Sequence, residues 1–198
     1  MRVLVACEFS GVVRDEFAKL GHDAWSCDLL PTERPGKHIV GDARTEAAIA
    51  WHLLIAHPPC TYLCNSGVRW LAPGGRLNTE RHKLMMEACD LFAEFYHSAA
   101  KRVAIENPVM HKYARDYLLS AWKVPAHSQT IQPWQFGHGE TKRTCLWLKN
   151  LPPLQPTRIV DGRTPRVHFA SPGPDRWKER SRTLTGIAEA MAQQWGRL

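Results

Sequence analysis

The sequence has no apolar run that approaches the ~20 residues a membrane-spanning helix needs. Its start shows no signal peptide pattern either, because Met1-Arg2 is followed directly by the strand-like Val-Leu-Val-Ala. No internal repeat is evident along the 198 residues. We therefore expect a protein without a membrane span, located in a cytoplasm, with one ordinary core.

Closely paired cysteines are also missing. None of the six cysteines forms a Cys-x-x-Cys pair, so in a cytosolic chain we expect reduced thiols. His57, Cys60 and Cys64 lie close together in the sequence, but no second ligand pair follows them at zinc-like spacing. A zinc nucleobase deaminase would carry Pro-Cys-x-x-Cys, whereas this chain has Pro-Cys-x-x-x-Cys. We expect no metal.

Acidic residues are scarce in the second half of the chain. Residues 1–100 contain 10 Lys/Arg and 12 Asp/Glu, a balance of −2, whereas residues 101–198 contain 16 Lys/Arg and 7 Asp/Glu, a balance of +9. A basic half of this kind favours contact with phosphates. A basic surface without a polyanionic partner is the alternative that charge alone leaves open.

Short apolar runs alternate with helical patterns over the first 150 residues, which predicts a mostly parallel sheet with helices on both faces, an α/β fold. Gly21, Thr45 and Thr79 are expected to end or cap helices. The predicted strands cover residues 2–7, 23–27, 38–40, 52–56, 101–105, 127–132 and 143–148. The predicted helices cover residues 11–20, 45–50, 79–99, 110–121 and 184–195.

Two segments lack such patterns. Residues 58–78 contain three prolines and three glycines and are predicted to form a long loop. Residues 150–182 contain six prolines and are predicted to form a basic loop or a small insertion. We therefore expect residues 1–198 to form a single domain.

Polar or reactive residues follow the predicted strands. In a parallel sheet, ligands bind beyond the C-terminal ends of the strands. Strand ends also meet solvent, so polar residues there have a second explanation. The five residues at these positions are Glu8, Asp28, Asp42, Cys60 and Glu106.

Cys60 and Glu106 form the most informative combination. A thiolate is a strong nucleophile at neutral pH, and Pro58 and Pro59 fix the loop that carries Cys60. Glu106 ends an apolar run, so we expect burial to raise its pKa and keep it protonated. A protonated Glu106 could hydrogen-bond the ring nitrogen and exocyclic amine of cytosine while the sulfur attacks C6. The alternatives are a buried structural cysteine and a glutamate bound to backbone amides.

The segment Phe9-Ser10-Gly11 follows the first strand and opens a helix, whose N-terminus favours a carboxylate ligand. Asp28 is placed to accept from ribose hydroxyls, and Asp42 from an adenine amine. Either aspartate alone could be a turn residue. The segment 135–144 combines glycines with Lys142 and Arg143, which suits a phosphate or a base carbonyl, or else a solvated hairpin.

The order of these motifs resembles that of the DNA cytosine-5 methyltransferases over most of residues 3–148. Pro59-Cys60 is similar to the nucleophile motif of that family, and Glu106-Asn107 to the motif that protonates the ring. The resemblance implies a Rossmann-like methyltransferase fold, S-adenosyl-L-methionine as cofactor, and a cytosine flipped out of DNA. It also implies that Phe9, with Ser10 and Gly11, packs against the adenine of the cofactor.

The same resemblance implies that Asp28 binds the ribose and Asp42 the adenine. Gly137 to Leu148 is similar to the Gln-x-Arg-x-Arg segment of the family, which implies that Lys142 and Arg143 contact the substrate. The pattern also resembles a group of compact, phage-borne relatives, so a bacterial or phage-infected host cell is the expected setting for DNA modification.

The chain departs from the family pattern in several places. Valine replaces the second glycine of the first motif, Cys64 stands at a usual serine, and Pro108 at a usual valine. The Gln and two Arg become Glu140, Lys142 and Thr144, with Arg143 as the candidate substitute. Only residues 150–182 stand where the family usually has a large target-recognition domain. They contain six arginines, which suit contacts with a nucleic-acid backbone, and Trp177, which suits stacking on a base.

We therefore expect transfer of a methyl, or a related one-carbon group, to C5 of cytosine in DNA with a short or loose site preference. Two other functions stay open. One is C5 modification of a free pyrimidine nucleotide, which needs no recognition domain. The other is a non-catalytic DNA-binding module that retains the methyltransferase fold, which the altered Gln-x-Arg-x-Arg segment favours.

Overall fold

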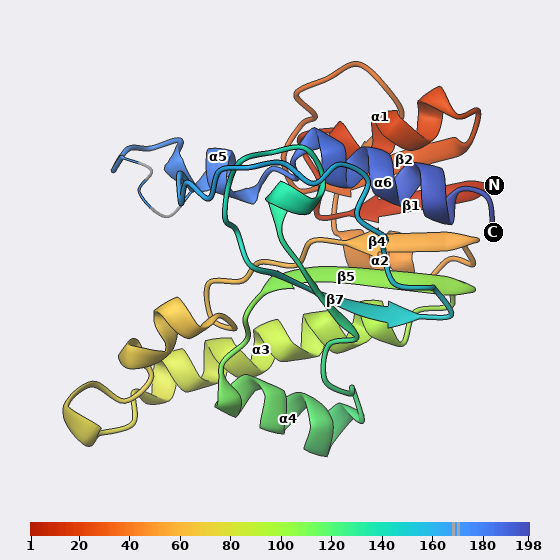
Figure 1. Ribbon diagram of the computed structural model, residues 1–198. Coiled ribbons are helices and arrows are strands. Elements are labelled where there is room, and N and C mark those ends of the chain that lie inside the picture. Colours follow the sequence, from red (N-terminus) through yellow and green to blue (C-terminus); the bar gives the residue numbers. More distant parts are fainter. Residues whose placement is uncertain (168, 170) are drawn as a thin grey trace.

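The computed structural model describes residues 1–167, 169 and 171–198, and its centre is one seven-stranded sheet. The strand order is β3-β2-β1-β4-β5-β7-β6 (Figure 1). Strands β1 to β5 run parallel, and β7 runs antiparallel to both of its neighbours, β5 and β6. The strands are β1 (Arg2–Ala6), β2 (Asp23–Asp28), β3 (His38–Val40), β4 (Leu53–Ala56), β5 (Arg102–Pro108), β6 (Gln129–Ile131) and β7 (Thr144–Lys149).

Helices cover both faces of this sheet (Figure 1). One face is covered by α1 (Val12–Lys19) and α6 (Thr185–Trp195), and the other by α2 (Ala43–Ala47), α3 (Thr79–Tyr96) and α4 (Lys112–Trp122). The alternation of buried side chains along β1 explains this, since Val3 and Val5 face the first layer while Leu4 and Ala6 face the second. The predicted α/β fold, a mostly parallel sheet with helices on both faces, is confirmed.

Several predicted element ends are wrong, and one of them affects the site. Strand β5 does not end at Ile105 but continues to Pro108, because Glu106, Asn107 and Pro108 pair with β7. Glu106 is therefore held inside a paired strand and does not lie in a loop after it.

Two predicted helix caps are also wrong. Helix α2 begins at Ala43, and its cap is the Asp42 side chain, which accepts from the backbone of Arg44. Helix α3 is capped by Asn78, whose side chain accepts from the Arg81 backbone. At the end of α1, Gly21 has the positive φ of 81° that the predicted glycine stop requires.

The two segments predicted as loops contain short helices. The first carries the 3-10 helices η1 (Asn65–Trp70) and η2 (Pro73–Gly75), and the second carries helix α5 (Arg176–Ser181). Figure 1 shows both segments at the side of the sheet where β4 leaves toward η1, whereas the two chain ends lie on the opposite side. His168 and Ala170, in the second segment, lie outside the described residues. Within the described part of the chain, every helix is too short or too polar to cross a membrane.

Candidate active site

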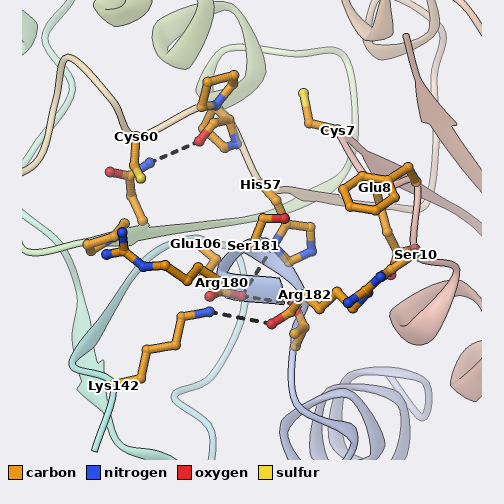
Figure 2. Close-up of a pocket in the computed structure, with 16 residues that line it drawn as sticks. Cys7, Glu8, Ser10, His57, Cys60, Glu106, Lys142, Arg180, Ser181 and Arg182 are labelled. Atoms are coloured by element: carbon orange, nitrogen blue, oxygen red, sulfur yellow. Dashed lines mark hydrogen bonds and ion pairs between the residues drawn. The ribbon is translucent and has the colours of Figure 1, made fainter. Parts of the chain in front are cut away.

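A cavity of about 130 Å³ lies beyond the ends of β1 and β4, beside the end of β5. Its size is close to the ~150 Å³ of an engineered cavity that accepts benzene, so a six-membered ring is of the right scale. Residues 180–183, at the end of α5 and just after it, complete the wall (Figure 2). The other lining residues are 7–10, 57–60, 106–108 and Lys142.

The loop that carries Cys60 is fixed from several sides. The backbone amide of His57 donates to Ala6 O at 3.0 Å, and Asn107 Nδ2 donates to Pro58 O at 3.2 Å. The amide of Cys64 donates to Cys60 O at 3.0 Å, which closes a turn. Ring rigidity at Pro58 and Pro59 limits the backbone further. Cys60 is therefore held in place by neighbouring strands.

Cys64 contacts Cys60, and the two thiols share their ionisation. The hydrogen bond from Cys60 lowers the pKa of Cys64 to about 5 although burial opposes this, with help from Ser66 and the Gly67 amide. The Cys64 sulfur lies 3.0 Å from Ser66 Oγ. The same contact and burial raise the pKa of Cys60. Cys64 is therefore the more acidic thiol of the pair.

Glu106 lies in the same cavity as Cys60, but its charge state differs from the prediction. Its Oε2 is 3.2 Å from His57 Nδ1 and accepts from Thr183 Oγ1 at 3.3 Å. Burial raises the pKa of Glu106, yet the hydrogen bond and charge of His57, with Lys142 and Thr183, lower it to about 2. The predicted raised pKa is wrong because a buried histidine supplies the counter-charge that the sequence reading left out.

His57 is a functional candidate that the sequence pattern does not reveal, since its spacing to Cys60 and Cys64 suggests only a zinc ligand. Burial lowers the pKa of His57, but Glu106 and Glu8 raise it above the ordinary value. Its Nε2 is buried and has no hydrogen-bond partner among the described residues. Figure 2 shows His57 between the Cys60 and Glu8 sides of the cavity, close to Glu106. Its position three residues before Cys60 was the available signal.

The N-terminus of α1 is already occupied by a side chain of the protein. Glu8 Oε1 accepts from the Val13 amide at 2.7 Å, and Oε2 from the Arg14 amide at 3.2 Å. Burial raises the pKa of Glu8. The expectation that these amides serve a ligand carboxylate is therefore wrong. Gly11 is required at the helix cap, because its φ is 70° and an added Cβ would lie 2.5 Å from Arg14 Nη2.

Only some of the other cofactor candidates line the cavity. Phe9 and Ser10 line the cavity, while Asp28 and Asp42 are not among its lining residues. Asp28, at the end of β2, accepts from the Leu30 amide at 3.0 Å, and its burial raises its pKa. Asp42 is exposed, and the side chain and amide of Arg44 engage both of its oxygens.

Helix α5 and the short segment that follows it close the cavity on the Phe9 side. The rings of Trp177 and Phe9 have centroids 5.7 Å apart. The Arg182 guanidinium donates to the two Glu33 oxygens at 2.9 and 2.6 Å. Lys142 Nζ lies 3.4 Å from the Arg182 carbonyl. Trp177 therefore contacts the residue predicted to meet adenine.

The loop before β7 brings only one of its two cations to the cavity. Lys142 lines it, whereas Arg143 is exposed and is not among the lining residues. The loop also contains a His-x-Glu triplet, His138-Gly139-Glu140, which the sequence reading overlooked. His138 Nε2 accepts from the Gly186 amide at 3.0 Å, and Glu140 pairs with Arg166 at 2.8 Å.

Among the described residues, no group of three or more His, Cys, Asp or Glu side chains is arranged to hold a metal ion. The His-x-Glu triplet thus stands apart from Cys60 and Cys64, and each of its two side chains has another partner.

No family model and no curated protein matches this sequence. Among solved structures, an E. coli protein described as a DNA modification methyltransferase encoded within a prophage is 12% identical, with a TM-score of 0.48 over 87% of this chain and 55% of that chain. The S. pombe Dnmt2 methyltransferase is 13% identical, with a TM-score of 0.37 over 100% of this chain and 66% of that chain. This chain spans less than two thirds of the length of either structure.

Proposed function

We propose that this chain is a cytosine-5 DNA methyltransferase that acts through a covalent bond between Cys60 and C6 of the base. The observation that carries the proposal is the convergence of Cys60 and Glu106 on one cavity, although 45 residues separate them in the sequence. A nucleophile and a proton-handling carboxyl group on one pyrimidine-sized cavity match the needs of this chemistry.

The reaction starts when Cys60 passes its thiol proton to the neighbouring Cys64 thiolate and the Cys60 sulfur adds to C6 of cytosine. The electrons of the C5–C6 double bond shift through the ring as N3 takes a proton that reaches it by way of Glu106. C5 is then nucleophilic toward the electrophilic methyl group that a bound cofactor would supply. Loss of the C5 proton to water expels the Cys60 sulfur as a thiolate, the N3 proton returns by way of Glu106, and the product is 5-methylcytosine. The bond between the Cys60 sulfur and C6 is thus broken again, and Cys60 and Glu106 are regenerated.

The residues on the Phe9 side suit S-adenosyl-L-methionine in chemical type. The Phe9 ring offers an apolar face, and Asp28 has a half-buried carboxylate with one oxygen engaged by the Leu30 amide. Phe9, Ser10, Gly11 and Asp28 would hold the cofactor, and Asp42 would join them on release of Arg44. When bound, the cofactor supplies an electrophilic methyl group.

Other residues of the cavity suit the base. Asn107 Oδ1 is buried and has no partner among the described residues, so it is available to an exocyclic amine. Pro59 fixes the approach to Cys60, and Lys142 offers a cation to a carbonyl or phosphate. Arg143 is exposed and is assigned to the DNA backbone.

We treat residues 1–198 as one catalytic domain in which 150–182 is a minimal recognition insertion. This segment contributes arginines on the basic half of the chain, whose balance of 16 Lys/Arg against 7 Asp/Glu favours a polyanion. Its small size offers little surface for reading base edges, so the target site is expected to be short or loose.

Oligonucleotides that contain 5-fluorocytosine test this function, because fluorine cannot leave C5 as a proton does. With S-adenosyl-L-methionine present, the expected result is a stable covalent complex detected by intact mass, lost in Cys60→Ser. Cys89→Ser is the matched control, since Cys89 is buried in α3 and does not line the cavity. Absence of a complex with both single-stranded and duplex DNA would contradict the proposal.

A free pyrimidine nucleotide is the second candidate substrate. It is favoured by Arg180 and Arg182, which line the small cavity together with Lys142 and could meet a single phosphate. This alternative predicts dCMP turnover and no salt-sensitive DNA binding. A non-catalytic module would instead bind DNA equally well after Cys60→Ala and form no product.

A further inference from the structure

The cavity holds an ionisable group, His57, that has no role in the chemistry proposed above. His57 lies on the loop that carries Cys60, and its Nδ1 is 3.2 Å from Glu106 Oε2. Its side chain is 12% exposed, and that of Glu106 is 11% exposed. The two groups therefore interact under conditions of weak solvent screening.

The charge state of this pair creates a chemical difficulty for Glu106 acting alone. Attack at C6 requires a proton at N3, and an ionised carboxylate has none to give. Because His57 lowers the pKa of Glu106 to about 2, that carboxyl group is ionised at neutral pH. A proton must therefore reach N3 from a neighbouring donor, and Nδ1 of His57 is within hydrogen-bond distance of Glu106 Oε2.

We propose that His57 is a positioning residue that stores the proton which Glu106 delivers to N3 of the base. As the sulfur–C6 bond forms, the N–H bond at His57 Nδ1 breaks, Glu106 receives that proton, and a carboxyl proton passes to N3. Imidazolium becomes neutral imidazole while the ring gains the proton. When the sulfur leaves, the N3 proton returns by the same route, so protons balance over a turnover. The inference rests on the proposed function.

The surroundings of His57 fit a stored proton. Glu106 faces it from β5, and Glu8 faces it from the segment after β1; both negative charges raise its pKa. Lys142, before β7, and burial both act in the opposite direction. Nε2 is buried without a partner among the described residues, so an incoming ligand or water could meet it. The charges of Glu106 and Glu8 outweigh the effects of burial and of Lys142, so the protonated form of His57 is favoured.

The direction of the pH dependence follows from this arrangement. His57 is protonated below its raised pKa and can then supply the proton. It loses that proton as pH rises through this value. Addition at C6 should therefore slow on the alkaline side even though thiolate formation becomes easier there. An enzyme limited only by Cys60 ionisation would show the opposite slope.

Exchange of the cytosine C5 hydrogen with D₂O, without any methyl donor, measures addition at C6 directly. The expected loss in His57→Gln is roughly 100-fold, the scale of one general acid–base contribution. His97→Gln is the control, because His97 is exposed at the end of α3 and bonds to Trp122 O. Wild-type exchange should fall as pH rises through the His57 pKa. Equal exchange in His57→Gln and wild type would overturn the inference but not the proposed function.

A second measurement covers the case in which His57→Gln does not fold. Histidine ¹⁵N NMR on the wild-type chain should place the His57 midpoint above the ordinary 6.5, and Glu106→Gln should lower it. A wild-type midpoint below 6.5 would overturn the proton store. If the wild-type chain neither exchanges hydrogen nor forms the 5-fluorocytosine complex, the proposed function itself fails, and the inference with it.

Discussion

The two sides of the cavity are built differently. On the nucleophile side, Cys60, His57 and Glu106 come from the ends of adjacent strands β4 and β5 and contact one cavity. On the cofactor side, the acidic candidates Asp28 and Asp42 are spread along β2 and α2 and do not line it. On the first side the candidate groups meet at one cavity. On the second side the acidic candidates already have partners within the protein.

This difference shows what a parallel sheet can and cannot do. Neighbouring parallel strands end at one edge, so residues far apart in the sequence meet there without further help. Residues that follow the outer strands meet only through loops, and there the protein's own groups compete with a ligand. Arg44 engages Asp42, and Trp177 contacts Phe9.

The largest expected effect is on the nucleophile side. Glu106→Gln should lower turnover by roughly 100- to 10,000-fold, because the amide neither accepts the stored proton nor delivers one to N3. Donor binding, measured by calorimetry, should stay unchanged since Glu106 is assigned to the base. Glu87→Gln is the control, with an exposed carboxylate on α3. Equal turnover in Glu106→Gln would remove Glu106 from the mechanism.

A smaller effect is expected on the cofactor side, in the affinity for S-adenosyl-L-methionine. Asp28→Asn should weaken S-adenosyl-L-methionine binding by roughly 10-fold, since a charge-assisted hydrogen bond contributes about 1.5–3 kcal/mol. Asp42→Asn should weaken it by less than about fivefold, because Arg44 already engages this exposed carboxylate. Calorimetric titration of both variants gives the comparison, and a larger loss in Asp42→Asn would reverse this ranking.

The thiol pair gives a test within the nucleophile side. At pH 6 the wild-type pair should react with iodoacetamide through the Cys64 thiolate, whose pKa is lowered to about 5. Removing that sulfur in Cys64→Ser should slow alkylation of the pair by about tenfold, since a lower thiolate fraction outweighs the greater nucleophilicity of a more basic thiol. Peptide mass spectrometry against pH reads the result. Unchanged alkylation at pH 6 would show that the charge does not reside on Cys64.

The smallest expected effect is on stability. The lowered pKa of Glu106 stabilises the fold above its ordinary 4.5, and this is lost as pH falls toward about 2. The raised pKa of His57 stabilises it below the ordinary 6.5, and this is lost as pH rises through the raised value. Glu106→Gln should therefore lower Tm most between pH 4.5 and 6.5, by roughly 2–4 °C for about 1 kcal/mol. A Tm difference that does not vary with pH would contradict the ion pair.

The fold was predictable because its signals are local. Runs such as Leu53–Ala56 and Val103–Ile105 are buried on both faces, and such continuous apolar segments predict parallel strands without knowledge of their neighbours. Helix α5 was not predictable in this way, because none of its residues is buried and its sequence is polar. Trp177 contacts Phe9 through tertiary structure alone.

The position of Cys60 and Glu106 was predictable, but their charge state was not. Cys60 and Glu106 follow apolar runs, which placed them at one edge of the sheet. The pKa of Glu106 depends on His57, which is 49 residues earlier and meets it only because β4 pairs with β5. Asp42 shows the reverse case, since its local role as a helix cap competes with the role that a resemblance implies.

The central claim is that the Cys60 sulfur and the Glu106 carboxyl group act on one pyrimidine ring. Fragmentation mass spectrometry of the 5-fluorocytosine complex tests it most directly, because Cys60 and Cys64 are in contact and intact mass cannot tell them apart. The expected result is a base attached to Cys60 in the wild-type chain and a complex strongly reduced in Glu106→Gln. Attachment at Cys64, or equal yield in Glu106→Gln, would contradict the claim.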